Sequence, residues 1–240
     1  HYINYNSSVT ATAGSRPGYL CTGWVGTGNV PTTGITDTAT FTITQQSTIT
    51  WQWENLGCSV TTTWNGTSWN NAEPNSLNTK IIFTGNYNSS LNPNNIGNLV
   101  GCSIEVNNNA DVIIASNHNV EIDNEIKIET GSSFTLKSDA NLIQNNHIDI
   151  VNEGIIKVER ASKMKRLDYI YWGSPVAGQS FINFSPNTVA SRFYRYNEEF
   201  DSFHSISNLN DSMIAGEGYA IRAPNNQNAT TPNTWTGIFV

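Results

Sequence analysis

A rhythm of short apolar and polar alternations between Lys80 and Glu159 constrains the fold more than any other feature of the sequence. The alternating segments read KIIF, SIEV, DVII, NVEI, EIKIE, SFTLK, NLIQ, HIDIV and IIKVE, with clusters of Asn, Gly and Ser between them. Their centres recur every ~7 to 9 residues, which leaves no room for helices and is typical of the stacked rungs of a β-solenoid. A meandering β-sandwich is the alternative architecture.

Alternation also assigns side chains to the two faces of each predicted strand. The positions expected to face inward are Ile104, Val106, Val120, Ile122, Ile126, Ile128, Phe134, Leu136, Ile148 and Ile150. The positions expected to face water are Glu105, Glu121, Asp123, Glu125, Lys127, Glu129 and Lys137. The runs 107–109 and 145–146 consist of asparagines, which suit corners because Asn tolerates left-handed backbone geometry and can ladder along stacked turns.

The rest of the chain also favours strands. Only 13% of the 240 residues are charged, and Asn, Thr, Ser and Gly supply most of the polar surface, so the composition predicts an all-β protein. The length exceeds the ~100 to 200 residues of a usual domain. We expect a small antiparallel β module at 1–54, the stacked-strand region at 55–160, and a further, incomplete β unit at 161–240. The closing sequence NTWTGIFV reads as a strand in progress, so we expect the protein to continue beyond Val240.

Charge and hydropathy exclude some partners. The net charge of -7 provides no attraction for a phosphate backbone, so no nucleic acid is expected. No apolar run approaches the ~20 residues that span a bilayer, so no transmembrane segment is expected. The first residues also lack the pattern of a signal peptide.

Tryptophans recur in the first third of the chain. Trp24, Trp51 and Trp53 could form a platform for sugar rings, but alternating aromatics in so small a module more often build its core, which we favour. Trp64 and Trp69 flank Asn65-Gly66, a strong hairpin signal, and we expect them to cap the apolar end of the stacked region.

Three cysteines, Cys21, Cys58 and Cys102, lack the spacing of a zinc site. Cys58 and Cys102 each open a segment of the middle region, and they could form a disulfide in an oxidising compartment. The alternative is that all three are small buried apolar residues.

Catalytic motifs are missing from the sequence. It contains no GxSxG, no HExxH and no glycine-rich phosphate loop, and we expect neither catalytic nor metal-binding nor cofactor-binding residues. The histidines His118, His147 and His204 are expected to be solvated or hydrogen-bonded.

One set of carboxylates could form a metal site and so contradict that expectation. Glu121, Asp123, Glu125 and Glu129 could bind Ca²⁺ beside Lys127 as the base of a polysaccharide lyase. We favour the alternative that these residues form the solvated side of ordinary strands.

The only basic cluster of the chain, Arg160, Lys163, Lys165 and Arg166, precedes the aromatic residues Tyr169, Tyr171 and Trp172. It could bind an acidic partner or a carboxylate of a polysaccharide. Ion pairing with the acids of the protein itself is the interpretation we favour.

An ordered set of motifs resembles a known group of proteins. TTWNGTSWNNAEP, KIIFTGNYNSS, CSIEVNNNADVII, IIKVERASKMKRLDYIYWGSPVAGQSFINFSPNT, RFYRYNE and MIAGEGYAIRAPNN look like large secreted proteins of gliding Bacteroidota, exported by the type IX secretion system. The resemblance covers about residues 58–240. YLCTGWVGTGNVP and FTITQQSTITWQW resemble repeat modules of bacterial surface proteins.

The resemblance implies export across the outer membrane and residence at the cell surface or outside the cell. Its implied partners are the secretion and outer-membrane motility machinery, and surface polysaccharide is a further candidate. It also implies O-glycosylation at Thr38 and Ser212, which lie in short acidic-Ser/Thr-apolar sequences.

Two functions follow as hypotheses. The leading one is a non-catalytic structural or adhesive segment of a type IX cargo, such as a gliding-motility adhesin. The alternative is a carbohydrate-active enzyme or carbohydrate-binding module, which requires an open groove lined by Tyr169, Tyr171, Trp172 or Trp69 beside Asp or Glu. A third hypothesis is that the region itself is recognised during export.

Overall fold

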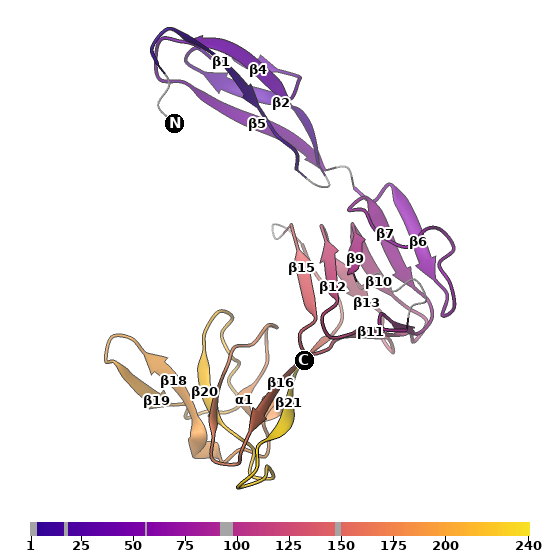
Figure 1. The fold of residues 1–240 in the computed structure, drawn as a ribbon, viewed down its shortest axis with the longest axis vertical. Coiled ribbons are helices and arrows are strands. Elements are labelled where there is room, and N and C mark those ends of the chain that lie inside the picture. The colour runs from indigo at the N-terminus through magenta and orange to yellow at the C-terminus, as the bar shows by residue number, and fades with distance from the viewer. Residues whose placement is uncertain (1–3, 17–18, 56, 92–97, 147–149) are drawn as a thin grey trace.

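Strands dominate the computed structural model, which describes residues 4–16, 19–55, 57–91, 98–146 and 150–240 (Figure 1). The described part is 48% strand and 3% helix, and it includes a β-solenoid of about 4 turns. The predicted all-β class is therefore confirmed, and the middle region is a solenoid and not a sandwich.

The N-terminal module is a pair of small antiparallel sheets. Their strands are β1 (Ser7–Thr12), β2 (Tyr19–Thr27), β3 (Thr33–Gly34), β4 (Thr38–Ile43) and β5 (Thr48–Asn55), in the orders β1-β4 and β3-β2-β5. Trp24 is buried and meets Trp51 edge to face, with ring centroids 5.7 Å apart. A Cβ at Gly34 would lie 2.1 Å from the Trp24 ring, so only glycine fits there. Trp24 and Trp51 thus belong to the core of the module, as the sequence predicts.

The solenoid has three sides, each a stack of mostly parallel strands. The first side contains β6 (Val60–Trp64), β7 (Thr79–Phe83), β10 (Ser103–Val106) and β13 (Ile126–Ile128). The second contains β8 (Tyr87–Asn88), β11 (Asp111–Ile114), β14 (Ser133–Leu136) and β16 (Ile156–Met164). The third contains β9 (Asn98–Gly101), β12 (Asn119–Ile122) and β15 (Asn141–Gln144). Because alternate side chains point inward, equivalent residues such as Ile81, Ile104 and Ile126 stack into one apolar column.

The expected inward positions hold in the second and third turns, and the expectation is wrong at Ile150. Those on β10, β12, β13 and β14 are all buried. Ile148 and His147 lie outside the described residues, Ile150 is half-buried outside any strand, and Val151 is exposed. Ile150 and Val151, the last two residues of the HIDIV segment, do not form a strand. The chain joins the first side only at Glu153, through a single bridge to Lys127.

Asparagines occupy several corners. Asn108 and Asn109 have φ values of 57° and 56°, so the predicted corner at 107–109 is confirmed. The ladder forms elsewhere, along the third side: Asn119 Nδ2 donates to Asn98 Oδ1 and Asn141 Nδ2 donates to Asn119 Oδ1. Each amide thus links one turn to the next.

Cys58 and Cys102 form a disulfide with their Cα atoms 5.4 Å apart. It ties the segment that enters the solenoid to the start of its second turn. Cys21 is a free thiol in the N-terminal module. At the same end of the solenoid, Trp64 and Trp69 pack together with ring centroids 5.4 Å apart and form an antiparallel bridge.

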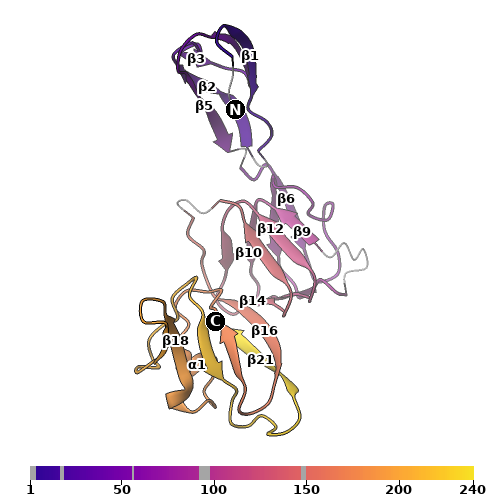
Figure 2. The same cartoon turned by 60° about the vertical axis from the view of Figure 1, so that its left-hand side comes forward.

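The C-terminal unit grows directly out of the solenoid through β16. This strand pairs in parallel with β14 at its start and antiparallel with β21 (Asn233–Phe239) over the rest of its length, as Figure 2 shows. The boundary expected at residue 160 falls inside β16. Trp172, Phe184 and Phe239 continue the apolar column, with Phe184 and Phe239 stacked at 4.4 Å, so the two units share one core.

The remaining elements complete this unit. They are β17 (Tyr169–Trp172), α1 (Phe181–Phe184), the 3-10 helix η1 (Ala190–Arg192), β18 (Phe193–Asn197), β19 (Ser202–Ser205) and β20 (Tyr219–Arg222). The order of the antiparallel sheet is β17-β20-β18-β19. No helix of the described residues has the length and the apolar composition needed to cross a membrane.

Candidate functional site: an exposed aromatic face

The outer face of the sheet β17-β20-β18-β19 carries aromatic side chains where a solvated face is normally polar. They are Tyr169 and Tyr171 on β17, Tyr194 and Tyr196 on β18, and Phe203 on β19. We call these five residues the aromatic face. Tyr171 is 71% exposed and Phe203 47%, so large apolar area meets solvent here.

The strand register explains how these residues share one face. Tyr171 and Tyr194 are both paired with Ala220, from opposite sides of β20, and Tyr196 is paired with Phe203. Cross-strand partners point to the same face of a sheet, so the small Ala220 lies between two tyrosines. Inward-facing partners such as Ile170 and Ile221 pack on the core.

The small side chain at Ala220 leaves a hollow between the rings. The hollow has a volume of about 310 Å³ and is lined by Tyr169, Tyr171, Tyr194, Phe203 and Ala220. Tyr169 and Tyr194 lie 5.9 Å apart at ring centroids, and Tyr171 and Phe203 lie 6.3 Å apart. The contacts between rings hold them in place, so the hollow is largely preformed.

Polar contacts fix the hydroxyl groups at the rim. Arg192 Nη1 donates to Tyr194 Oη at 3.3 Å, and this hydrogen bond lowers the pKa of the Tyr194 phenol. The Tyr196 hydroxyl donates to Asp201 Oδ1, which raises the pKa of Tyr196 because the bond favours the protonated phenol. Both rings are thus oriented from their polar ends.

A second hollow adjoins the aromatic face and brings carboxylates beside it. It is about 850 Å³ and is lined by Tyr171, Tyr196 and Phe203 together with Glu198 and Glu217. Glu217 accepts from the Tyr219 hydroxyl at 2.9 Å and lies 3.8 Å from Arg195. The aromatic rings therefore have hydrogen-bonding acids and a guanidinium within the same surface.

This arrangement suits a ligand that is flat, partly apolar and rich in hydroxyl groups. Tyrosine rings offer apolar faces for stacking and hydroxyls that both donate and accept hydrogen bonds. Carboxylates and guanidinium groups around them can bind further hydroxyls. Sugar rings have this chemistry.

The groove residues expected from the sequence separate into two groups. Tyr169 and Tyr171 are in the aromatic face. Trp172 is not, because it points to the opposite side of β17, is 8% exposed and packs on Phe184 and Trp235. Trp69 belongs to the other end of the solenoid, where it contacts Trp64 and Phe83.

Sequence reasoning did not assign Tyr194, Tyr196 and Phe203 to the site. A signal was present, because Tyr194 and Tyr196 alternate in RFYRYN and so share one face of a strand. That pattern predicts a strand, but it does not tell which face of the strand meets solvent. Phe193, which precedes Tyr194, is the buried residue of this strand, and the two tyrosines point to the other face.

The basic cluster does not form one surface. Arg160 and Lys163 are three residues apart on β16, and side chains an odd number of residues apart point to opposite faces of a strand. The favoured pairing with the protein's own acids is not found: the ion pairs among described side chains involve Lys80, Lys127, Lys137 and Arg195 instead. Arg160 donates to the main-chain oxygens of Glu159 and Ala140.

The carboxylates proposed for Ca²⁺ do not line one face. Glu121 is on the third side and Glu129 follows β13 on the first side, with a corner between them. Asp123 was expected to face water, but at that corner it is only 1% exposed. Burial raises the pKa of Asp123, and Asn145 Nδ2 donates to Asp123 Oδ1 and to Glu121 Oε1. The described residues contain no group of three or more His, Cys, Asp or Glu placed to hold a metal ion.

The remaining candidates lie apart from the aromatic face. Thr38 and Ser212 are both exposed, and Thr38 Oγ1 donates to Asp37 Oδ1 at 3.1 Å. His118 Nδ1 is 2.7 Å from Ser89 Oγ, and His204 Nε2 is 3.1 Å from Ser202 Oγ. Hydrogen bonds therefore engage both histidines.

Comparison with known proteins gives one result. A family model described as "Domain of unknown function (DUF8693)" matches residues 30–240, which is most of the chain. No curated protein and no solved structure matches the chain.

Proposed function

We propose that this chain, which belongs to the DUF8693 family, is a non-catalytic adhesive segment of a cell-surface protein and binds polysaccharide through the aromatic face. The observation that carries the proposal is the exposed set Tyr169, Tyr171, Tyr194, Tyr196 and Phe203 around the Ala220 hollow. Exposed apolar patches of this kind mark binding sites in soluble proteins.

The disulfide supports a location outside the cytoplasm. Disulfides persist in oxidising compartments and are rare where glutathione and thioredoxin keep thiols reduced. The bond between Cys58 and Cys102 therefore favours export. Export by the type IX system, contact with outer-membrane motility components and O-glycosylation at Thr38 and Ser212 extend the proposal on the strength of the sequence resemblance.

The solenoid supports an adhesive role because it can act as a stiff spacer. Stacked parallel strands with one apolar column make a stiff unit in which each turn contacts its neighbours. Such a unit can hold the aromatic face away from the anchoring point of a surface protein.

A second candidate is a carbohydrate-active enzyme that uses Glu198 and Glu217 beside the rings. These are the acids that line the adjoining hollow. Paired carboxylates would supply general acid and base for glycoside cleavage. Glu217 already accepts a hydrogen bond from Tyr219 and lies near Arg195, an arrangement that holds it as an anchored carboxylate, and so we favour binding without cleavage.

Glycan-array binding and polysaccharide pull-down test the proposal. The wild-type chain should bind a subset of polysaccharides, and Tyr171→Ala should weaken that binding at least tenfold. Tyr5→Ala is the matched control, because Tyr5 is 77% exposed but lies in the N-terminal module. Absence of binding across the array overturns the proposal. Release of reducing ends from a bound polysaccharide, abolished by Glu217→Gln, favours the enzyme instead.

A further inference from the structure

The fourth turn of the solenoid lacks one of its three sides. Glu153 continues the first side by its bridge to Lys127, and β16 continues the second side beside β14. In the part of the chain that the structure describes, the third side ends at β15, because β16 runs on into the C-terminal unit instead of turning. One strand position of the third side is therefore vacant next to β15.

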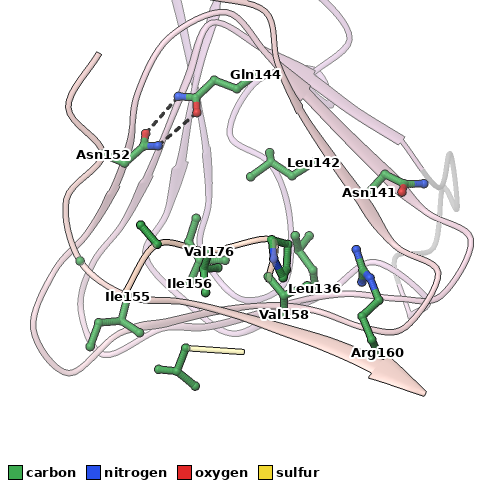
Figure 3. Close-up of a pocket in the computed structure, with 14 residues that line it drawn as sticks. Leu136, Asn141, Leu142, Gln144, Asn152, Ile155, Ile156, Val158, Arg160 and Val176 are labelled. Atoms are coloured by element: carbon green, nitrogen blue, oxygen red, sulfur yellow. Dashed lines mark hydrogen bonds between the residues drawn. The ribbon is translucent and has the colours of Figure 1, made fainter. Parts of the chain in front are cut away.

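A cleft of about 700 Å³ lies at this position (Figure 3). Its apolar walls are formed by Leu136, Leu142, Ile156, Val158 and Val176. Figure 3 shows Leu142 on one side of the space and the other four side chains on the opposite side. A rung in this place would cover Leu142, which is only half-buried.

The edge of β15 offers main-chain hydrogen-bonding groups to the cleft. Alternate residues of a parallel strand direct their N–H and C=O groups to opposite neighbours. The N–H groups of Asn141 and Asn145 are bonded to His118 and Ile122 of the neighbouring turn. Leu142 and Gln144 consequently direct theirs away from β12, toward the vacant position.

The two ends of the cleft differ in charge. At the Gln144 end, the side-chain amides of Gln144 and Asn152 form two hydrogen bonds with each other. Gln144 Nε2 donates to Asn152 Oδ1 at 3.0 Å, and Asn152 Nδ2 donates to Gln144 Oε1 at 3.1 Å. Arg160 lies at the Asn141 end. Its Nη2 donates to the Ala140 carbonyl oxygen at 3.4 Å, and its Nη1 donates to the Glu159 carbonyl oxygen. A guanidinium has five N–H donors, so capacity for a carboxylate remains. Among the residues that the structure describes, no acidic side chain lines the cleft.

We propose that this cleft binds an extended peptide that adds to β15 as the missing strand, antiparallel to it, with a carboxylate at Arg160. The open main-chain edge selects a polypeptide, since an acyl chain or a sugar has no ladder of amides to offer. Side chains at alternate positions of the peptide point into the column and should be aliphatic. A C-terminal carboxylate reaches Arg160 only when the peptide runs antiparallel to β15, because Arg160 lies near Asn141 at the start of that strand.

Titration calorimetry with a designed probe tests the proposal. The probe is a seven-residue peptide in which valine alternates with threonine and which ends in a free carboxylate. We expect saturable binding to the wild-type chain. The same peptide with a C-terminal amide should bind about tenfold more weakly, and a version N-methylated on the edge-facing residues should not bind.

Variants separate the carboxylate contact from a loss of folding. Arg160→Gln should weaken the free-acid peptide about tenfold and leave the affinity of the amidated peptide unchanged. Lys163→Gln is the control on the opposite face of the same strand and should change neither affinity. Thermal melts of both variants verify that the chain is folded.

Three outcomes overturn the proposal. The first is the absence of saturable binding by the free-acid peptide. The second is equal affinity for the N-methylated and parent peptides, or displacement of both peptides by decanoate. Either result would show that the cleft binds apolar ligands without using the main-chain edge. The third is slow hydrogen exchange at the Leu142 and Gln144 amides without peptide, because those groups would then already be paired. None of these results depends on whether the aromatic face binds polysaccharide.

Discussion

The solenoid and the C-terminal sheet differ in the side chains that their outer faces carry. On the solenoid, residues such as Ile104 and Phe134 point into the column, and their neighbours Glu105 and Thr135 are more exposed. On the C-terminal sheet the inward face is apolar too, but the outward face carries Tyr171 and Phe203 in the open. Apolar area in the column stabilises the fold, whereas apolar area on the outer face contributes little to stability and is available for binding.

Removing one phenylalanine from each region gives the largest expected contrast. Phe134→Ala should lower the free energy of unfolding by roughly 3 to 5 kcal/mol, because it opens a cavity in a column where Phe134 is fully buried. Phe203→Ala should change it by about 0.5 kcal/mol or less. Urea unfolding followed by circular dichroism measures both. Equal losses would show that Phe203 is a structural residue and would remove the contrast.

Reduction of the disulfide should weaken the solenoid and spare the aromatic face. Opening the loop between Cys58 and Cys102 should cost up to about 4 kcal/mol. Thermal unfolding of the Cys58→Ser, Cys102→Ser double variant measures the cost, with Cys21→Ser as the control thiol. Polysaccharide affinity of the folded fraction should stay within twofold of wild type. A large loss of affinity would mean that the two regions are coupled.

Filling the hollow tests the aromatic face without removing a ring. Ala220→Leu places a larger side chain between Tyr171 and Tyr194, and polysaccharide affinity should fall about tenfold, or about 1.4 kcal/mol. Affinity electrophoresis in polysaccharide-containing gels measures the change. Unchanged mobility shifts would indicate that binding uses another surface, such as the adjoining hollow near Glu198.

The smallest effect concerns pH and the buried acid of the solenoid corner. Burial raises the folded-state pKa of Asp123 above its unfolded value, so its ionisation disfavours the folded state, and this penalty disappears as the pH falls through the folded-state pKa. Asp123→Asn should therefore stabilise the chain at pH 7 and stabilise it less near pH 4. Melting temperatures across this range measure it. Glu125→Gln, exposed at the same corner, should show no such trend.

The solenoid was predictable from sequence because its signal is local and repeated. Each strand shows alternation over four or five residues, and Asn108 and Asn109 mark a corner by residue type alone. The burial of Asp123 was not predictable, since alternation was extended across a corner where the chain changes direction. At Ile150 the alternation continues in sequence, but the residue lies outside any strand, and no local pattern indicates that the rung is interrupted there.

The aromatic face was only half predictable. Tyr169 and Tyr171 stand out because they alternate with buried residues on one strand. Their proximity to Tyr194 and Phe203 depends on the strand order β17-β20-β18-β19, in which neighbours in space are far apart in sequence. Ala220 forms the floor of the hollow only through that order, and nothing in its own sequence context indicates the role.

Strand β16 has a mechanical consequence. It is hydrogen-bonded to β14 of the solenoid at one end and to β21 of the C-terminal unit along the other, without interruption between them. Tension applied along the axis of β16 would load many of these hydrogen bonds in shear at once and would not open them one by one. A force applied at the aromatic face should thus be transmitted into the solenoid as a shear load, and the two units should yield together in a single rupture event.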